Sequence, residues 1–200
     1  MHKTLGIALA LTLAASPALA SDARIGEPAP GFTLTDTAGV THNLSDFAGK
    51  TVVLEWTNHD CPFVKKHYDG ENMQRQQAEA TGDGVVWLVV NSSAEGKQGH
   101  VTPAQADQIQ AAWKAQQTAY LFDPDGTVGR AYGAKTTPHM YIIDPEGVLR
   151  YNGAIDSIPS ASPADIGQAE QYVEIALAEL AAGQPVSRPL TQPYGCSVKY

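Results

Sequence analysis

Apolar strands that alternate with helices constrain the fold of this chain more than any other feature of its sequence. The runs Thr51–Trp56 and Val85–Val90 are rich in β-branched residues, which favour buried strands. Between them a helix is predicted from Pro62 to about Ala80, because proline suits the first helical position. Strands separated by helices in this way predict an α/β fold with a central mixed sheet and helices on both faces.

The rest of the chain continues this alternation. Residues 32–35 and 40–44 predict an N-terminal β-hairpin extension, because apolar and polar residues alternate on either side of a turn. Further elements are expected as a helix at 102–117, a strand at 119–122, a short helix at 127–132, strands at 140–143 and 148–151, and a helix from Pro163 to about Ala182. The stretch 184–200, called the tail below, contains three prolines and is expected to lie extended over the body of the protein.

The first twenty residues have the pattern of a secretory signal peptide. A positive start at Lys3 is followed by the apolar run Leu5–Ala15, which at eleven residues is too short to span a bilayer. Small residues then predict cleavage after Ala20, and an N-terminal anchor or a buried helix is the alternative. We therefore expect a signal peptide at 1–20, one domain at 21–183 and then the tail. The expected location is a bacterial periplasm or the outside of the cell, with no membrane attachment after cleavage, because no second apolar run of this kind follows.

Charge and cysteine content exclude several classes of protein. The chain has 21 acidic and 13 basic residues, a net charge of −8, which argues against a nucleic-acid-binding protein. Its two cysteines, Cys61 and Cys196, are too few for a disulfide-stapled small scaffold or a four-cysteine zinc site. Because secretion would place them in an oxidising compartment, they are a potential disulfide pair.

Cys61 is the first candidate for chemistry. It follows a predicted buried strand and directly precedes Pro62, so its thiol is expected near the unpaired N–H groups and the positive dipole of a helix N-terminus. Lys65, Lys66 and His59 add positive charge nearby. These features favour the thiolate and predict a pKa below the ordinary value of about 8.5. The alternative is a buried, inert cysteine beside a solvated lysine face.

A second candidate lies at Thr137-Pro138, directly before the strand predicted at 140–143. Proline cannot donate a hydrogen bond to a strand ladder, so its place beside a strand is restricted. A cis peptide bond between Thr137 and Pro138 would accommodate it.

These features together resemble the thioredoxin-like superfamily, and in particular its redoxin branch of the alkyl hydroperoxide reductase and thiol-specific antioxidant (AhpC/TSA) type. The resemblance covers nearly the whole chain after residue 20 and is carried by the segments 28–34, 44–56, 61–62 and 137–144. It implies that Cys61 is the attacking thiol and that Thr137 and Pro138 line the substrate groove. The run Cys-Pro-Phe-Val-Lys-Lys-His-Tyr at 61–68, with Gly-Cys-Ser-Val-Lys-Tyr at 195–200, is similar to a subgroup of secreted bacterial redoxins.

The chain departs from the patterns of this superfamily at three positions. Val64 stands where thiol–disulfide enzymes place the second cysteine of a Cys-X-X-Cys motif, so Cys61 cannot form the short-range disulfide. Asn58 replaces the Thr or Ser that peroxiredoxins carry three residues before the reactive cysteine, and Pro138 stands where they carry an arginine. Both missing groups polarise the peroxide in peroxiredoxins, so disulfide exchange is a better expectation than efficient peroxidase activity. Asn58 and His59 are the residues nearby that could donate hydrogen bonds to a peroxide in place of the two missing groups.

Cys196 is the remaining partner for Cys61. A flexible, proline-rich tail would bring it onto Cys61 as a resolving thiol through thiol–disulfide exchange. One alternative is a purely structural disulfide, which would close a long loop and stabilise the fold by up to about 4–5 kcal/mol. The other is a thiol that stays unpaired.

Two functions are consistent with these residues. The first is a secreted thiol–disulfide oxidoreductase or antioxidant redoxin, in which Cys61 attacks a protein or small-molecule disulfide, or a peroxide, and Cys196 resolves the product. An external thiol reductant would restore both cysteines, with no nucleotide, flavin or metal cofactor. The second is a non-catalytic binding module with a thioredoxin fold and a static Cys61–Cys196 bridge.

A metal site is the least favoured interpretation. The candidate ligands are His59, Cys61, His67 and His139. Copper chaperones with this fold use two nearby cysteines, and this chain has only one in that region. His67 is instead expected on the helix surface, so no metal site is predicted.

Overall fold

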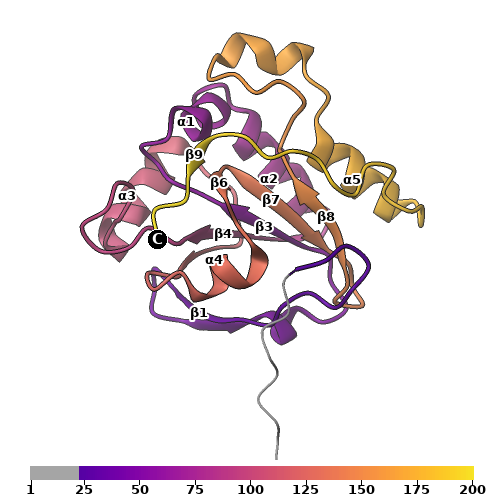
Figure 1. Cartoon of the computed structure of the whole chain (residues 1–200), viewed down its shortest axis with the longest axis horizontal. Helices are drawn as coiled ribbons and strands as arrows, with labels where there is room; N and C mark the ends of the chain where they lie inside the picture. The colour runs from indigo at the N-terminus through magenta and orange to yellow at the C-terminus, as the bar shows by residue number, and fades with distance from the viewer. Residues whose placement is uncertain (1–22) are drawn as a thin grey trace, which may run out of the picture.

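The computed structural model describes residues 23–200, so the signal peptide predicted at 1–20 lies outside the described residues (Figure 1). The strands are β1 Thr33–Asp36, β2 Thr41–Asn43, β3 Val52–Trp56, β4 Val86–Asn91, β5 Ala119–Phe122, β6 Thr136–Thr137, β7 His139–Ile143, β8 Leu149–Gly153 and β9 Cys196–Ser197. The helices are η1 Leu44–Phe47, α1 Pro62–Asp69, α2 Asn72–Gly82, α3 Pro103–Trp113, α4 Thr127–Tyr132, η2 Pro163–Gln168 and α5 Tyr172–Ala181, where η marks a 3₁₀ helix. Among residues 23–200, no helix has the length and apolar character needed to cross a membrane.

Seven strands form one mixed sheet in the order β2-β1-β5-β4-β3-β7-β8. The pairs β3–β4 and β4–β5 are parallel, whereas β7 runs antiparallel to β3 and β8 antiparallel to β7. The N-terminal hairpin of β1 and β2 joins the sheet through antiparallel pairing of β1 with β5. The predicted α/β class with a central mixed sheet is therefore confirmed.

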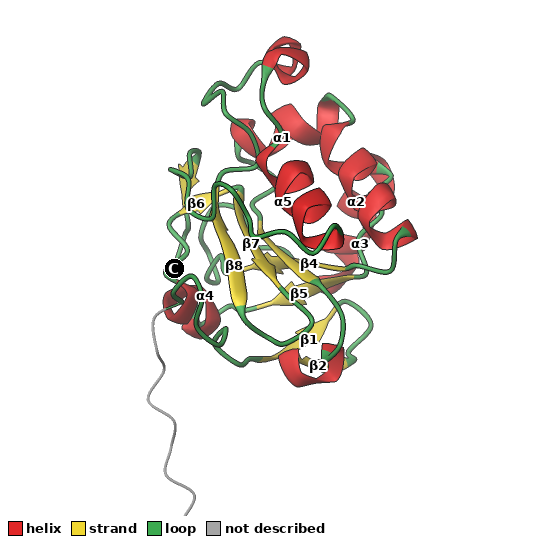
Figure 2. Cartoon of the chain, turned by 90° about the vertical axis from the view of Figure 1, so that its right-hand side faces the viewer, coloured by secondary structure: helices red, strands yellow, loops and turns green. Residues whose placement is uncertain are grey.

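The central strand β3 separates two hydrophobic cores. Val52, Leu54 and Trp56 face one core, while Val53 faces the other, because successive side chains of a strand point to opposite sides. Helices α1, α2, α3 and α5 cover the Val53 side and α4 covers the opposite side (Figure 2). Trp56 and Trp87 are fully buried.

Two helices that the sequence predicts as continuous are interrupted. The one beginning at Pro62 ends at Asp69, and Glu71 then takes a left-handed conformation with φ 56° before α2 begins. A Cβ on Gly70 would lie 2.5 Å from Cδ1 of Ile166, so this glycine lets η2 pack against the break. The helix predicted from Pro163 to Ala182 is split into η2 and α5, because Gln171 forms an antiparallel bridge with Asp156.

The tail lies extended across the protein, as expected, and is docked along its length (Figure 1). It first follows the edge strand β8, where the Asn152 N–H donates to Pro189 O at 3.0 Å and the Thr191 N–H donates to Asn152 O at 3.2 Å. A Cβ on Gly153 would lie 2.0 Å from Thr191 Oγ1, so only glycine permits this approach. Further on, β9 pairs antiparallel with β6, and the Tyr200 hydroxyl donates to Ala134 O at 2.8 Å.

Candidate active site

Cys61 lies at the junction of β3 and α1 and is the N-cap of α1. Its carbonyl accepts hydrogen bonds from the backbone N–H groups of Val64 at 3.0 Å and Lys65 at 2.9 Å, which start the helix. Pro62 occupies the first turn, where its missing N–H leaves no bond unmade. Cys61 is fully buried, so the sulfur sits beneath other parts of the chain.

The Thr137-Pro138 loop faces this cysteine. The peptide bond between the two residues is cis, as the sequence suggested. Trp56 at the end of β3 pairs with His139 at the start of β7, which brings the loop beside the junction that carries Cys61. The Cys61 thiol donates to Thr137 O over 3.1 Å.

Cys196 reaches the same place from the tail. Within β9 and β6, Cys196 pairs with Thr137, and its backbone N–H donates to Cys61 Sγ at 3.4 Å. Both cysteines are free thiols in this structure. Gly195 makes the approach possible, because it has φ 136° and its Cβ would lie 2.0 Å from Thr137 O. The second cysteine is therefore held against the first by strand pairing, whereas a flexible tail was expected.

The two thiols differ in acidity. Burial acts to raise the pKa of Cys61, but hydrogen bonding with Cys196, with the Thr137 side chain and with the Val64 N–H outweighs it and holds that pKa below its ordinary value. Burial, followed by the hydrogen bond and the charge of Cys61, raises the pKa of Cys196 to about 12. Cys61 is therefore the thiol that ionises first.

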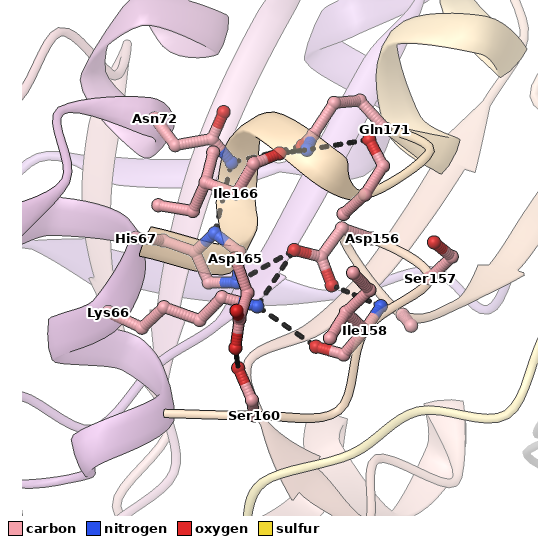
Figure 3. Close-up of polar contacts among 12 residues, drawn as sticks. Lys66, His67, Asn72, Asp156, Ser157, Ile158, Ser160, Asp165, Ile166 and Gln171 are labelled. Carbon is pink, nitrogen blue, oxygen red and sulfur yellow. Dashed lines mark hydrogen bonds and ion pairs between the residues drawn. The ribbon is translucent and has the colours of Figure 1, made fainter. Parts of the chain in front are cut away.

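The lowered pKa of Cys61 is confirmed, but the lysines are not its cause. The Lys65 side chain is exposed. Lys66 is fully buried and forms an ion pair of 2.9 Å with Asp156, so its charge is already matched (Figure 3). His67 is also buried, which corrects the expectation of a surface position. The two lysines do not form one solvated face, because Lys65 is exposed whereas Lys66 is buried against Asp156.

Asn58 and His59 lie in the loop that leads to Cys61. The Asn58 side chain is buried, donates to Gln98 O at 3.3 Å and accepts from the Asp60 N–H at 2.9 Å. Its amide therefore shapes the loop. His59 is partly exposed, and its Nε2 lies 3.4 Å from the Asp60 carboxylate. Across residues 23–200, no group of three His, Cys, Asp or Glu side chains is arranged to hold a metal ion.

Glu55, a fully buried carboxyl group on β3, is not among the residues that the sequence singled out. It accepts hydrogen bonds from the Tyr68 hydroxyl at 3.0 Å, from Gln77 Nε2 at 3.1 Å and from Trp87 Nε1 at 2.9 Å. All three donors are neutral, so burial dominates and raises the pKa of Glu55 to about 7. An acidic residue inside a strongly apolar strand was the signal that could have revealed it.

This carboxyl group predicts a pH-dependent stability. Its pKa rises from 4.5 to about 7 on folding, so the folded state holds the proton more tightly. The stabilisation is complete below pH 4.5 and is lost as the pH rises through 7, a change of about 3 kcal/mol. Glu55→Gln lacks this titration. The difference in unfolding free energy between the wild type and Glu55→Gln should therefore change by about 3 kcal/mol as the pH rises from below 4.5 to above 7. Urea unfolding at a series of pH values measures it.

The exposed Glu95 provides the control for this measurement. Glu95→Gln should follow the wild-type pH dependence throughout. A Glu55→Gln protein whose stability also parallels the wild type would show that Glu55 does not titrate in this range.

Comparison with solved structures supports the thioredoxin-like fold. A hypothetical protein from Sinorhizobium meliloti superposes with a TM-score of 0.75 at 23% identity, over 90% of this chain and 96% of that one. An uncharacterised conserved protein from Geobacillus kaustophilus gives 0.74 at 27% identity, over 88% and 92%. A candidate thiol:disulfide interchange protein, DsbE, from Chlorobium tepidum gives 0.54 at 27% identity, over 66% and 85%.

The sequence itself was compared with curated proteins and with models of protein families. No curated protein matches it. The model of the AhpC/TSA family matches residues 25–152, which include Cys61, the cis-proline loop and the seven-stranded sheet except the last residue of β8. This match covers more than half of the chain, which therefore belongs to the AhpC/TSA family.

Proposed function

We propose that this protein is a thiol–disulfide oxidoreductase in which Cys61 is the nucleophile and Cys196 the resolving cysteine. The observation that carries the proposal is the approach of the two residues, with the Cys196 N–H at 3.4 Å from Cys61 Sγ. Without a cysteine at position 64, this long-range pair is the one arrangement by which two protein thiols can exchange with a substrate.

The comparisons support the broader statement that the protein has a redox function. Its family is the AhpC/TSA family, and one structural neighbour is a candidate thiol:disulfide interchange protein. Such proteins act on disulfides or peroxides and exchange electrons with thiol partners. The leader pattern at 1–20 supports a periplasmic or secreted location, where disulfides persist.

The proposed reaction begins with the Cys61 thiolate. It attacks one sulfur of a substrate disulfide, a mixed disulfide forms, and the second substrate sulfur leaves as a thiolate. Burial is the largest cause of the raised pKa of Cys196, but the contribution from the negative charge on Cys61 has now gone, and the departing thiolate accepts the Cys196 proton. Cys196 then attacks Cys61 Sγ, and the remaining substrate sulfur leaves. Two electrons have moved from the cysteine pair to the substrate, and an external dithiol returns them.

Disulfide exchange fits this site better than peroxide reduction. A peroxidase needs hydrogen-bond donors directed at the peroxide oxygens. The Asn58 amide is engaged with Gln98 and Asp60, and Pro138 has no donor. Peroxide chemistry is therefore the second candidate reaction.

The complete burial of Cys61 favours the other function considered, a binding module with a static bridge. A glutathione titration with alkylation and mass mapping separates the two. For an enzyme, we expect the pair to change reversibly between dithiol and disulfide at buffer potentials above roughly −300 mV, where labile disulfides lie. A pair that stays bonded at more reducing potentials, or a Cys61 that resists alkylation after reduction, would rule out the enzymatic role.

A further inference from the structure

A buried ion pair lies behind the site. Lys66 of α1 and Asp156, in the loop after β8, are both fully buried, with Nζ 2.9 Å from Oδ2 (Figure 3). Lys66 Nζ also donates to Ile158 O at 2.9 Å. A charge pair taken out of water is tolerated only when its remaining hydrogen-bonding groups are also satisfied.

The hydroxyl of Tyr194 provides the remaining partner. It donates to Asp156 Oδ1 and accepts from Lys66 Nζ at 3.2 Å. It also lies 3.2 Å from His67 Nε2. Asn72 Nδ2 lies 3.0 Å from His67 Nδ1, and because an amide nitrogen only donates, Nε2 must carry the imidazole proton and donate to the phenol. The phenol thus uses its proton and both lone pairs, which phenylalanine could not do.

This network joins the two cysteine-bearing segments. Lys66 and His67 belong to α1, the helix that Cys61 caps, whereas Tyr194 lies two residues before Cys196 in the tail. The Phe63 ring packs edge-on against Tyr194 with centroids 5.8 Å apart. Polar and apolar contacts of α1 therefore fix the tail immediately before Cys196.

We infer that Tyr194 is a positioning residue that holds Cys196 against Cys61, with the buried Lys66–Asp156 pair as its binding site. The inference rests on the proposed function, in which Cys196 attacks Cys61 Sγ and displaces a substrate thiolate. That attack depends on how often the Cys196 sulfur lies within reach, so a tail released from α1 lowers the effective concentration of Cys196.

The test is the glutathione titration of the full chain carrying Tyr194→Phe. Loss of hydrogen bonds to charged groups should lower the effective concentration of Cys196 about tenfold. The Cys61–Cys196 disulfide then becomes easier to reduce by about 30 mV, the tenfold change converted for two electrons. Mass spectrometry should also show a Cys61–glutathione adduct that the wild type does not accumulate.

Tyr68→Phe is the matched control. It removes a buried hydroxyl of α1 that bonds Glu55 and Gln77 and does not contact the tail. It should lower stability without shifting the redox titration. A shift seen only in Tyr194→Phe then cannot come from a general loss of stability. If the titration of Tyr194→Phe superimposes on that of the wild type, the positioning role of Tyr194 is overturned and the proposed function is not. A wild-type pair that never titrates would overturn the proposed function, and the inference with it.

Discussion

Replacement of Cys61 by serine is expected to abolish disulfide reduction, with a loss of at least about 10³-fold in rate. The hydrogen bonds around Cys61 stabilise a thiolate, and a serine hydroxyl does not ionise near neutral pH. No other thiol can replace it, because Cys196, the only other cysteine, lies in the tail and not at the N-terminus of α1. Reduction of a peptide disulfide with dithiothreitol as the terminal donor measures the rate.

Cys196→Ser is the informative counterpart. It should retain the first attack by Cys61 and accumulate the mixed disulfide, which mass spectrometry identifies. The same variant tests the peroxide reaction, because a sulfenic acid on Cys61 would persist in it. Rapid oxidation by hydrogen peroxide would make peroxide the preferred substrate. Full turnover in Cys61→Ser would contradict the role given to Cys61.

The second large effect concerns stability. Asp156→Ala should lower the free energy of unfolding by about 3–5 kcal/mol, because it leaves the Lys66 ammonium buried without its counter-charge. The loss should exceed that of an ordinary surface ion pair, since both side chains are inaccessible to water. Urea unfolding followed by circular dichroism measures the difference.

Two further variants isolate the charge. Lys65→Met changes the exposed neighbour of Lys66 and should be close to neutral. Lys66→Met combined with Asp156→Ala removes both charges and should recover part of the loss, so the two substitutions should not be additive. If Asp156→Ala were as mild as Lys65→Met, the buried pair would contribute little to the fold.

The sequence predicts the sheet well because its strands carry their own signal. The β-branched runs around Val53 and Val89 are buried strands whatever packs on them. Of the two helix interruptions, the sequence marks only Gly70 as a weak point, because both depend on distant partners: Gly70 meets Ile166, and Gln171 bridges to Asp156. Local propensity cannot report contacts across that separation in the chain.

The candidate site was predictable in part for the same reason. Cys61 and the cis-Thr137-Pro138 loop have local signatures, a strand–proline–helix junction and a proline beside a strand. The polarity of α1 was misread, because Lys66 and His67 resemble surface residues until a buried acid faces them. The docking of Cys196 involves only a two-residue strand, which gives no periodicity to detect.

The course of the tail along β8 has a consequence for assembly. β8 is one of the two edge strands of the sheet, and an open edge is a template for pairing with another chain. Pro189 and Thr191 form hydrogen bonds with the backbone N–H and C=O of Asn152 on that edge. A tail that leaves the protein would therefore uncover the Cys61 sulfur and part of a strand edge at once. The covering of the cysteine and the covering of the edge thus depend on the same stretch of chain.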